Sequence, residues 1–325
     1  MSQHLPPRDQ LIVQFAHPTY RFQRTAENCK IQLKCFQTWN FDETWSNIEA
    51  ANVLVISGLW RNELLNVAPN LLYVQSISAG TEQYSLESLQ ERGIRLCSAS
   101  GVNADAVSHH AIGLILSLAR QLHLARDNQN KSHWRPGISE QSKREIDLRG
   151  KTLLIVGLGN IGSRIATIAS TFGMKVIGLK NRIEEYEGVV KQVCRPNQMN
   201  DLLSVSDFVV LCCPLTDATR NLIDKDALSN MKESGYLVNV ARGACVDEDA
   251  LLSALEEGQI AGAAIDHFLD EPLPTSSAFW KLNNVVITPH SAGETANYEE
   301  SVIEILVKNI EILYSDRGEL TNQVL

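Results

Sequence analysis

Short apolar runs separated by amphipathic stretches recur along the chain, a pattern that predicts alternating strands and helices. Near the N-terminal end, residues 11–16, 53–57 and 72–78 predict strands, and residues 86–92 predict a helix closed by Gly93. The strand-like runs are continuously apolar, which is typical of parallel strands covered on both faces. We therefore expect an α/β domain at this end of the chain.

A long helical pattern follows from residue 103 to residue 126. Its apolar positions cover much of the helix circumference, so we expect this helix to be buried on more than one side. The next stretch, residues 128–149, is polar and contains Pro136-Gly137. We interpret it as an excursion from the core.

A second series of alternating elements begins at Lys151. A final amphipathic helix over residues 296–315 can return the chain to the first domain. Strand-helix alternation indicates a doubly wound parallel sheet. The predicted strands are residues 152–156, 175–179, 208–213, 236–240, 261–266 and 285–288, and the predicted helices between them are residues 161–172, 225–231 and 248–257.

Composition limits the class of protein. A chain of 325 residues suits two domains, and 44% hydrophobic with 21% charged residues is ordinary for a globular protein. The net charge of -9 argues against binding of nucleic acid, which requires a basic surface. No apolar run is long enough to span a bilayer, and Pro6-Pro7 would interrupt a signal peptide, so we expect a cytoplasmic protein.

The seven cysteines are scattered along the chain and form no C-x-x-C motif. An odd number without regular spacing predicts neither a disulfide framework nor a zinc site. We expect free thiols in a reducing compartment and no metal.

The clearest motif is Gly157-Leu158-Gly159-Asn160-Ile161-Gly162, which lies between a predicted strand and a predicted helix. The first glycine permits a tight turn, the second lets the backbone approach a diphosphate, and the third lets the helix pack on the strand. The start of the helix attracts anions through its N–H groups and dipole. Because another predicted strand follows, we favour a dinucleotide site over an ordinary glycine-rich turn.

The end of that next strand bears on which dinucleotide binds. Proteins that bind NAD usually carry an acidic residue there, which accepts hydrogen bonds from the ribose hydroxyls. This chain has Lys180-Asn181-Arg182 instead. The two cationic side chains can pair with a 2′-phosphate, although they can also be ordinary surface charges. We therefore expect NADP, with NAD as the alternative.

Three segments with charged or titratable residues follow later strands, at the sheet edge where open α/β sheets bind ligands. Arg242 follows the predicted strand 236–240, Glu271 lies beyond the strand 261–266, and His290 follows the strand 285–288. An arginine in a crevice needs an anion, so Arg242 indicates a carboxylate substrate unless its side chain turns to solvent.

Taken together and in this order along the chain, these motifs resemble those of the D-isomer-specific 2-hydroxyacid dehydrogenase family. The resemblance is densest from Asp147 to Gly293. It rests on the glycine motif, on Pro214-Leu215-Thr216, and on residues 239–243, 266–272 and 288–293; residues 78–81 and 103–110 match more loosely. The family implies two Rossmann-like, doubly wound α/β domains with parallel sheets and an interdomain cleft. Residues 1–102 with 294–325 would form the substrate domain, and residues 103–293 the dinucleotide-binding domain.

The resemblance also implies the roles of individual residues. Arg242, Glu271 and His290 would be catalytic, with Arg242 and His290 also contacting the substrate. The backbone of Ala79, Gly80 and Thr81 would hold the substrate carboxylate, and Asp266 would orient the nicotinamide carboxamide. The expected cofactor contacts are Gly157, Gly159, Asn160, Ile161, Gly162, Lys180, Asn181, Arg182, Cys213, Pro214, Ala241, Asp266 and Gly293.

Two residues depart from the family pattern. Lys180 replaces the usual acid after the second strand, and His109 stands where the family commonly has glutamate. The family further implies a homodimer joined through the dinucleotide domains, by the apolar helix after Asn103 and the excursion that follows it. We expect the other histidines, including His110 and His267, to be structural.

The three catalytic candidates suit reduction of a 2-oxo acid, which needs a hydride at C2 and a proton at the carbonyl oxygen. Histidine titrates near neutrality, so His290 can supply the proton, and Glu271 would favour its charged form. Arg242 would polarise the carbonyl group and bind the carboxylate. Glyoxylate, hydroxypyruvate or a larger 2-oxo acid would yield the D-2-hydroxy acid, a stereochemistry that rests on the family.

Two alternatives stay open at this point. A corepressor-like protein can use the dinucleotide as a sensed ligand, although the complete trio of residues favours an enzyme. A dehydrogenase of phosphite or formate can also use the same scaffold.

Overall fold

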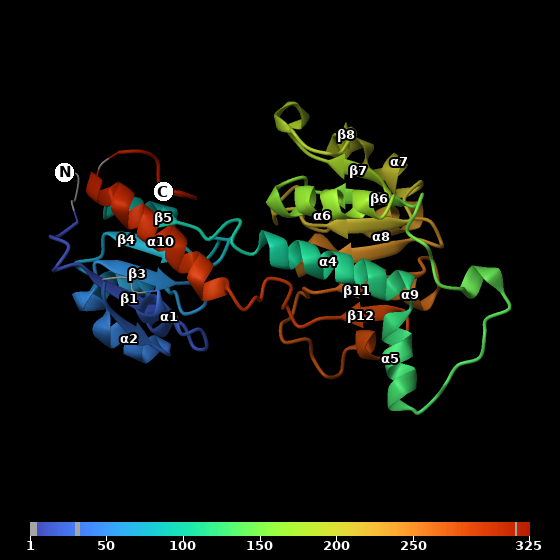
Figure 1. The fold of residues 1–325 in the computed structure, drawn as a ribbon, viewed down its shortest axis with the longest axis horizontal. Coiled ribbons are helices and arrows are strands. Elements are labelled where there is room, and N and C mark those ends of the chain that lie inside the picture. Colours follow the sequence, from blue (N-terminus) through green and yellow to red (C-terminus); the bar gives the residue numbers. More distant parts are fainter. Residues whose placement is uncertain (1–4, 30–32, 316) are drawn as a thin grey trace. The chain divides into compact units, whose positions relative to one another are not determined.

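The computed structural model describes residues 5–29, 33–315 and 317–325. The chain forms two compact units (Figure 1). Unit 1 is Met1–Asn103 with Thr295–Leu325, and unit 2 is Ala104–Glu294. Each boundary lies one residue from the expected domain limit, while the roles of the domains and the cleft between them stay predictions.

Within the described residues, the core of unit 1 is a sheet of five parallel strands in the order β2-β1-β3-β4-β5. This is the flavodoxin-like doubly wound order, in which the winding reverses between β1 and β3. The strands are β1 (Ile12–Ala16), β2 (Lys34–Thr38), β3 (Val53–Ile56), β4 (Tyr73–Ser76) and β5 (Arg95–Cys97).

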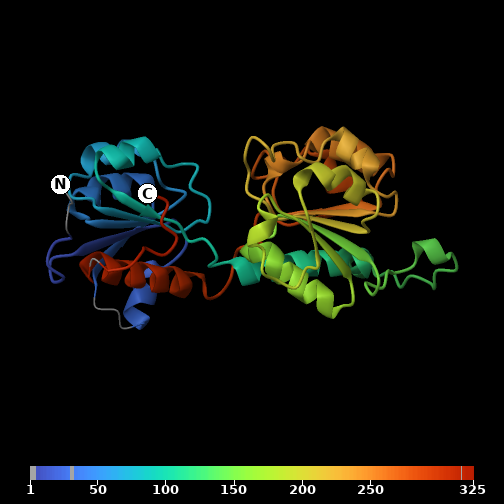
Figure 2. The same cartoon turned by 90° about the horizontal axis from the view of Figure 1, so that it is seen from above.

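Helices cover both faces of this sheet (Figure 2). Helices α1 (Phe22–Asn28) and α10 (Tyr298–Ser315) pack on one face, so the C-terminal helix belongs to the same unit as the N-terminal strands. Helices α2 (Phe41–Asn47) and α3 (Leu86–Glu91) lie over the other face.

Unit 2 contains, among the described residues, a sheet of seven parallel strands in the order β12-β11-β10-β9-β6-β7-β8. The winding reverses between β6 and β9, as in the Rossmann fold, where this switch point receives the ligand. The strands are β6 (Thr152–Val156), β7 (Lys175–Leu179), β8 (Gln192–Cys194), β9 (Phe208–Leu211), β10 (Tyr236–Asn239), β11 (Gly262–Ile265) and β12 (Val285–Ile287).

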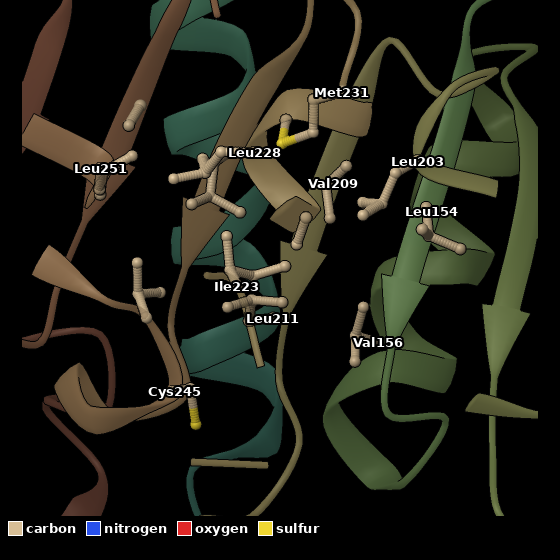
Figure 3. Packing of buried hydrophobic residues seen from close by; sticks show 14 of the residues in the cluster. Leu154, Val156, Leu203, Val209, Leu211, Ile223, Leu228, Met231, Cys245 and Leu251 are labelled. Carbon is tan, nitrogen blue, oxygen red and sulfur yellow. The ribbon is translucent and has the colours of Figure 1, made fainter. Parts of the chain in front are cut away.

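The alternation of side chains along β6 builds two separate core layers. Leu154 and Val156 pack with α7, α8 and α9 (Figure 3), whereas Leu153 and Ile155 pack with α4 and α6. The helices are α4 (Ala104–Ala119), α5 (Leu122–Asn130), α6 (Asn160–Thr171), α7 (Met199–Leu203), α8 (Lys225–Asn230) and α9 (Glu248–Glu256). Both units therefore have the doubly wound α/β fold that the sequence predicts.

Short 3-10 helices complete the described secondary structure. They are Ile48–Ala50, Asn62–Val67, Gln141–Lys143, Ile183–Glu185, Pro196–Gln198, Gly243–Cys245 and Ala278–Lys281. No helix of the described part of the chain has both the length and the apolar character that crossing a membrane requires.

The prediction of one continuous helix over residues 103–126 is wrong. Helix α4 ends at Ala119, and Gln121 adopts a left-handed backbone conformation with φ of 54° before α5 begins. The returning excursion explains the break: the N–H of Ile146 donates to the carbonyl of Ala119 at 2.7 Å, and the side chain of Gln121 donates to the carbonyl of Lys143. The first bond occupies the carbonyl of Ala119, which a continued helix would use, and the second ties Gln121 to the returning segment.

Three strands that the apolar runs did not predict are β2, β5 and β8. All three lie at sheet edges and carry exposed or half-buried positions. An edge strand is covered less completely, so its sequence need not be continuously apolar.

Candidate active site

The glycine motif follows β6 and leads directly into α6. Gly157 has φ of 105°, a conformation that favours glycine, and a Cβ there would lie 2.9 Å from the backbone of Cys213. A Cβ on Gly162 would lie 2.0 Å from the carbonyl oxygen of Gly157. Both glycines are therefore required by close packing of strand, turn and helix.

Gly159 has a different environment, because a Cβ at this position would meet no atom of the described chain within 4 Å. Gly159 lines a cavity of about 370 Å³ at the switch point, and the N-terminus of α6 begins at the next residue. Open space beside a glycine at a helix start is what an approaching diphosphate requires. The cavity fits the phosphate-bearing part of a dinucleotide.

The polar residues expected to select the dinucleotide line this same cavity. Lys180, Asn181 and Arg182 follow the end of β7, and Cys213 and Pro214 follow β9. The ammonium group of Lys180 lies 3.4 Å from the carbonyl oxygen of Leu158, within the glycine motif. Seven of the thirteen predicted cofactor residues therefore line one cavity. The other six lie outside its lining: Asn160, Ile161, Gly162, Ala241, Asp266 and Gly293.

The side chain of Cys212 contacts the first glycine of the motif. Burial raises the pKa of Cys212 to about 12, so it stays a thiol, and its Sγ donates to the carbonyl of Gly157 at 3.0 Å. The neighbouring Cys213 and Cys245 thiols interact, and this interaction together with burial raises the pKa of Cys213.

Arg242 lies in a tight turn after β10. The buried side chain of Asn239 holds this turn, accepting from the N–H of Ala241 and donating to the carbonyl of Arg242, both at 3.0 Å. Gly243 allows the turn to pack against the segment after β11, because a Cβ there would lie 2.2 Å from the backbone of Phe268. Arg242 itself is half-buried, with Nη1 donating to the carbonyl of Ala241.

His290 and Glu271 form a hydrogen-bonded pair. Nδ1 of His290 lies 2.7 Å from Oε2 of Glu271, whose other oxygen accepts from the N–H of Phe268 at 3.1 Å. His290 has φ of 53°, a strained conformation for a residue with a side chain, and its N–H donates to the carbonyl of Asp266. The pair lines a cavity of about 600 Å³ whose other walls are mainly apolar, including Leu273 and Trp280.

The carboxylate of Asp266 is buried and anchors the segment that carries His290. It accepts hydrogen bonds from Thr288 Oγ1 at 2.5 Å, from the N–H of Ser291 at 3.0 Å and from the N–H of Ala292 at 3.1 Å. Because the Thr288 hydroxyl donates to Asp266, it can accept from Nε2 of His110 on α4, 3.0 Å away. Binding of the nicotinamide carboxamide by Asp266 stays a prediction.

His267 is a member of this region that the sequence did not single out as functional. Its ring centroid lies 3.9 Å from that of His290, and its side chain is only 6% exposed. The sequence signal for it was its position directly after Asp266, at the end of the same strand. Distance between the two histidine rings is a tertiary property that no local pattern reveals.

The expected carboxylate-binding residues Ala79, Gly80 and Thr81 lie in unit 1, directly after β4. Ser78 beside them forms a hydrogen bond with Ser57, which joins the loops that follow β3 and β4. Their contact with a substrate stays a prediction. In residues 5–29, 33–315 and 317–325, no cluster of His, Cys, Asp or Glu side chains is arranged to hold a metal ion.

Comparison with known proteins agrees with this geometry. Residues 112–292 match the NAD binding domain of the D-isomer specific 2-hydroxyacid dehydrogenase family. A glyoxylate reductase of Pyrococcus horikoshii is 36% identical over 274 residues, which cover 83% of this chain and 80% of the relative.

Solved structures give the same result over nearly the whole chain. A D-isomer specific 2-hydroxyacid dehydrogenase family protein from Aeromonas salmonicida has a TM-score of 0.83 at 28% identity, covering 97% of this chain and 99% of that one. An NADPH-dependent glyoxylate/hydroxypyruvate reductase from Sinorhizobium meliloti, in complex with NADP and malonate, has a TM-score of 0.79 at 25% identity, with 97% of both chains covered.

The fold and the dinucleotide cavity define an NAD(P)-dependent oxidoreductase with two doubly wound units. Its family follows from the match over more than half of the chain: the protein belongs to the D-isomer specific 2-hydroxyacid dehydrogenases. The class of enzyme and the family predicted from the sequence are confirmed.

Proposed function

We propose that this enzyme reduces a small 2-oxo acid to the D-2-hydroxy acid with NADPH, and that Arg242, Glu271 and His290 are its catalytic residues. The observation that carries the proposal is the 2.7 Å hydrogen bond between His290 and Glu271, beside the turn that holds Arg242. Relatives at 35–38% identity that bear the name glyoxylate reductase support a substrate of this class.

In this proposal, His290 supplies the proton. Glu271 occupies Nδ1 of His290, so Nε2 is the ring nitrogen left to protonate the carbonyl oxygen. Glu271 stabilises the imidazolium, which exists until that proton is delivered. When bound, the reduced nicotinamide supplies the hydride that reaches C2 of the substrate.

Arg242 is the group that meets the substrate's negative charge in this proposal. Its guanidinium is half-buried and forms one hydrogen bond with a backbone carbonyl, from Nη1, which leaves other N–H donors for a ligand. A planar guanidinium suits both a carboxylate and the developing alkoxide. The proposed substrate-binding residues also include Ala79, Gly80 and Thr81, as the resemblance to the family implies.

Preference for NADPH is supported by the residues at the end of β7. Lys180 and Arg182 line the dinucleotide cavity at the position where an acidic residue would accept from a ribose hydroxyl. A solved relative at 25% identity was crystallised with NADP. Two cationic side chains there favour the cofactor that carries a 2′-phosphate.

The test of the proposal is a spectrophotometric screen of 2-oxo acids, including glyoxylate and hydroxypyruvate, against NADPH and NADH. We expect turnover of at least one acid, with higher kcat/KM for NADPH. Tight dinucleotide binding without turnover of any acid would favour a sensor, and oxidation of phosphite or formate would favour the other dehydrogenase; either result would overturn the proposal.

His290→Ala tests the assigned mechanism separately. Loss of proton transfer should lower kcat by about a hundred- to ten-thousandfold, while dinucleotide binding stays within error of the wild type. His123→Ala, which removes a histidine from α5, is the matched control and should keep full activity. Near-normal turnover by His290→Ala would remove His290 from the mechanism.

A further inference from the structure

Two histidine rings are in contact at the carboxyl end of the unit 2 sheet. The ring centroids of His267 and His290 lie 3.9 Å apart, with 47° between the ring planes. The two side chains differ sharply in environment, since His290 is 52% exposed and His267 only 6% exposed. A buried imidazole therefore contacts the ring of the proposed proton donor.

Charged groups face His267 from several segments. Its Nδ1 lies 3.4 Å from Oδ2 of Asp266, yet is a buried nitrogen without a hydrogen-bond partner among the described residues. Arg242, after β10, and Glu271, in the segment after β11, also act on it electrostatically. On the far side of Asp266, Nε2 of His110 lies 3.6 Å from Oδ1. His267 is thus surrounded by the candidate catalytic groups rather than by apolar core alone.

Two imidazoles at this separation cannot both be protonated without strong repulsion between like charges. Burial opposes the charged form of His267, and together with the nearby His290 it lowers the pKa of His267 to about 4. His290 has contact with solvent and a carboxylate partner, Glu271, so it is the better site for the charge. His267 is therefore the neutral ring of the pair.

We propose that His267 is a positioning residue for His290: a buried neutral ring that holds the His290 imidazole against Glu271. This inference rests on the proposed function only in naming His290 the proton donor. Contact with a second ring supports a side chain whose own backbone conformation is strained and whose ring is half exposed to solvent. Without that contact, the ring can rotate away from Glu271.

The first experiment follows the nitrogen chemical shifts of the histidine side chains in the cofactor-free protein as pH changes, which needs no substrate. In the wild type, we expect His267 to stay neutral over the pH range in which His290 titrates. Above that range, His290 should be one tautomer, with its proton on Nδ1 toward Glu271. Protonation of His267 at or above the pH at which His290 is protonated would overturn the proposal.

Two substitutions separate positioning from simple packing. His267→Ala removes the supporting ring, so neutral His290 should populate both tautomers, whereas His267→Phe keeps a ring and should restore the Nδ1–H form. His123→Phe is the control for removing a histidine elsewhere and should leave His290 unchanged. A single, unaltered His290 tautomer in His267→Ala would contradict the proposal, whatever that variant's stability.

Kinetics provide the second measurement. His267→Ala should lower kcat at least about tenfold, because displacement of a catalytic group by around 1 Å has effects of this order, and dinucleotide affinity should not change. His267→Phe should recover most of the rate. Equal kcat for His267→Ala and wild type would overturn the positioning role. A wild type that turns over no 2-oxo acid would instead refute the proposed function, and the tautomer measurement would still decide the role of His267.

Discussion

Lys180 lies directly after β7, where the Rossmann fold meets the ribose of the adenosine half of a dinucleotide. Its ammonium group is close to the glycine motif, so it borders the phosphate end of the cavity as well. A charge-assisted hydrogen bond contributes roughly 1.5–3 kcal/mol, which corresponds to at least about tenfold in affinity. We predict that Lys180→Asp reverses the preference from NADPH to NADH, because aspartate repels the 2′-phosphate and accepts from ribose hydroxyls.

The measurement is the ratio of kcat/KM for the two cofactors. Lys175→Asp makes the same change of charge at the opposite end of β7, outside the residues that line the cavity, and should leave the ratio unchanged. Equal or better kcat/KM of the wild type with NADH would show that the NADPH assignment is wrong, while the dehydrogenase assignment would survive.

The lowered pKa of His267 also predicts how the stability of the protein changes with pH. In the unfolded chain it protonates near pH 6.5, whereas burial lowers the pKa of folded His267 to about 4. Between these values the unfolded state binds more protons, so the free energy of unfolding falls as pH falls from 6.5 to 4. His267→Phe lacks this contribution and should lose about 3 kcal/mol less than the wild type across that window. Parallel urea-denaturation curves for the two proteins would contradict the prediction.

At the scale of elements, the contact of α6 with β6 depends on Gly162. A Cβ there would lie 2.0 Å from the carbonyl oxygen of Gly157 and 3.1 Å from Sγ of Cys212. The backbone oxygen cannot move without distorting the turn, so Gly162→Ala should displace α6. We predict destabilisation of about 1–3 kcal/mol and at least tenfold weaker NADPH binding, measured by urea denaturation and fluorescence titration.

Gly113 on α4 offers a matched control. A Cβ at Gly113 would meet no described atom within 4 Å, and the residue lies inside a regular helix. Gly113→Ala should therefore stabilise the protein by roughly 0.5–1 kcal/mol and leave binding unchanged. If Gly162→Ala binds NADPH as tightly as the wild type, packing at this position does not shape the site.

At the scale of the whole molecule, the apolar surface after residue 103 divides into two parts. The apolar residues of α4 are largely buried within unit 2, against α6 and the sheet, which explains why this helix is more apolar than a surface helix needs to be. Helix α5 has no buried residue, and Leu122 is 54% exposed. In the excursion that follows (green in Figure 2), Trp134 is 96% exposed.

Association of two copies through α5 and the excursion would remove these apolar side chains from water. We predict that the protein is a homodimer in solution and that α5 and the excursion form its interface. Sedimentation at micromolar concentration should give a dimer, and Trp134→Ser should shift it toward monomer. Trp39→Ser, which removes an exposed tryptophan from unit 1, should not. A clean monomer for the wild type would reject the prediction.

The sequence by itself determined the elements whose signals are local. Buried parallel strands are continuously apolar, so β6, β7 and β9 were predicted to within a few residues. The glycine motif predicted its turn correctly, because the need for glycine in a tight turn depends on residues that are close together in the sequence. Since every strand of unit 2 is parallel, the residues after successive strands were also expected at one edge of the sheet.

Only the tertiary structure decided which of those residues touch. Pairing of His290 with Glu271 and with His267 joins segments after β11 and β12, and His110 reaches Thr288 from α4. The break at Gln121 depends on a segment that returns 22 residues later, at Lys143. The periodicity of apolar residues predicts which side chains are buried, but it does not predict which residues bury them. Contacts between distant segments depend on the order of strands in the sheet and on where the chain returns, and neither is encoded in a local pattern.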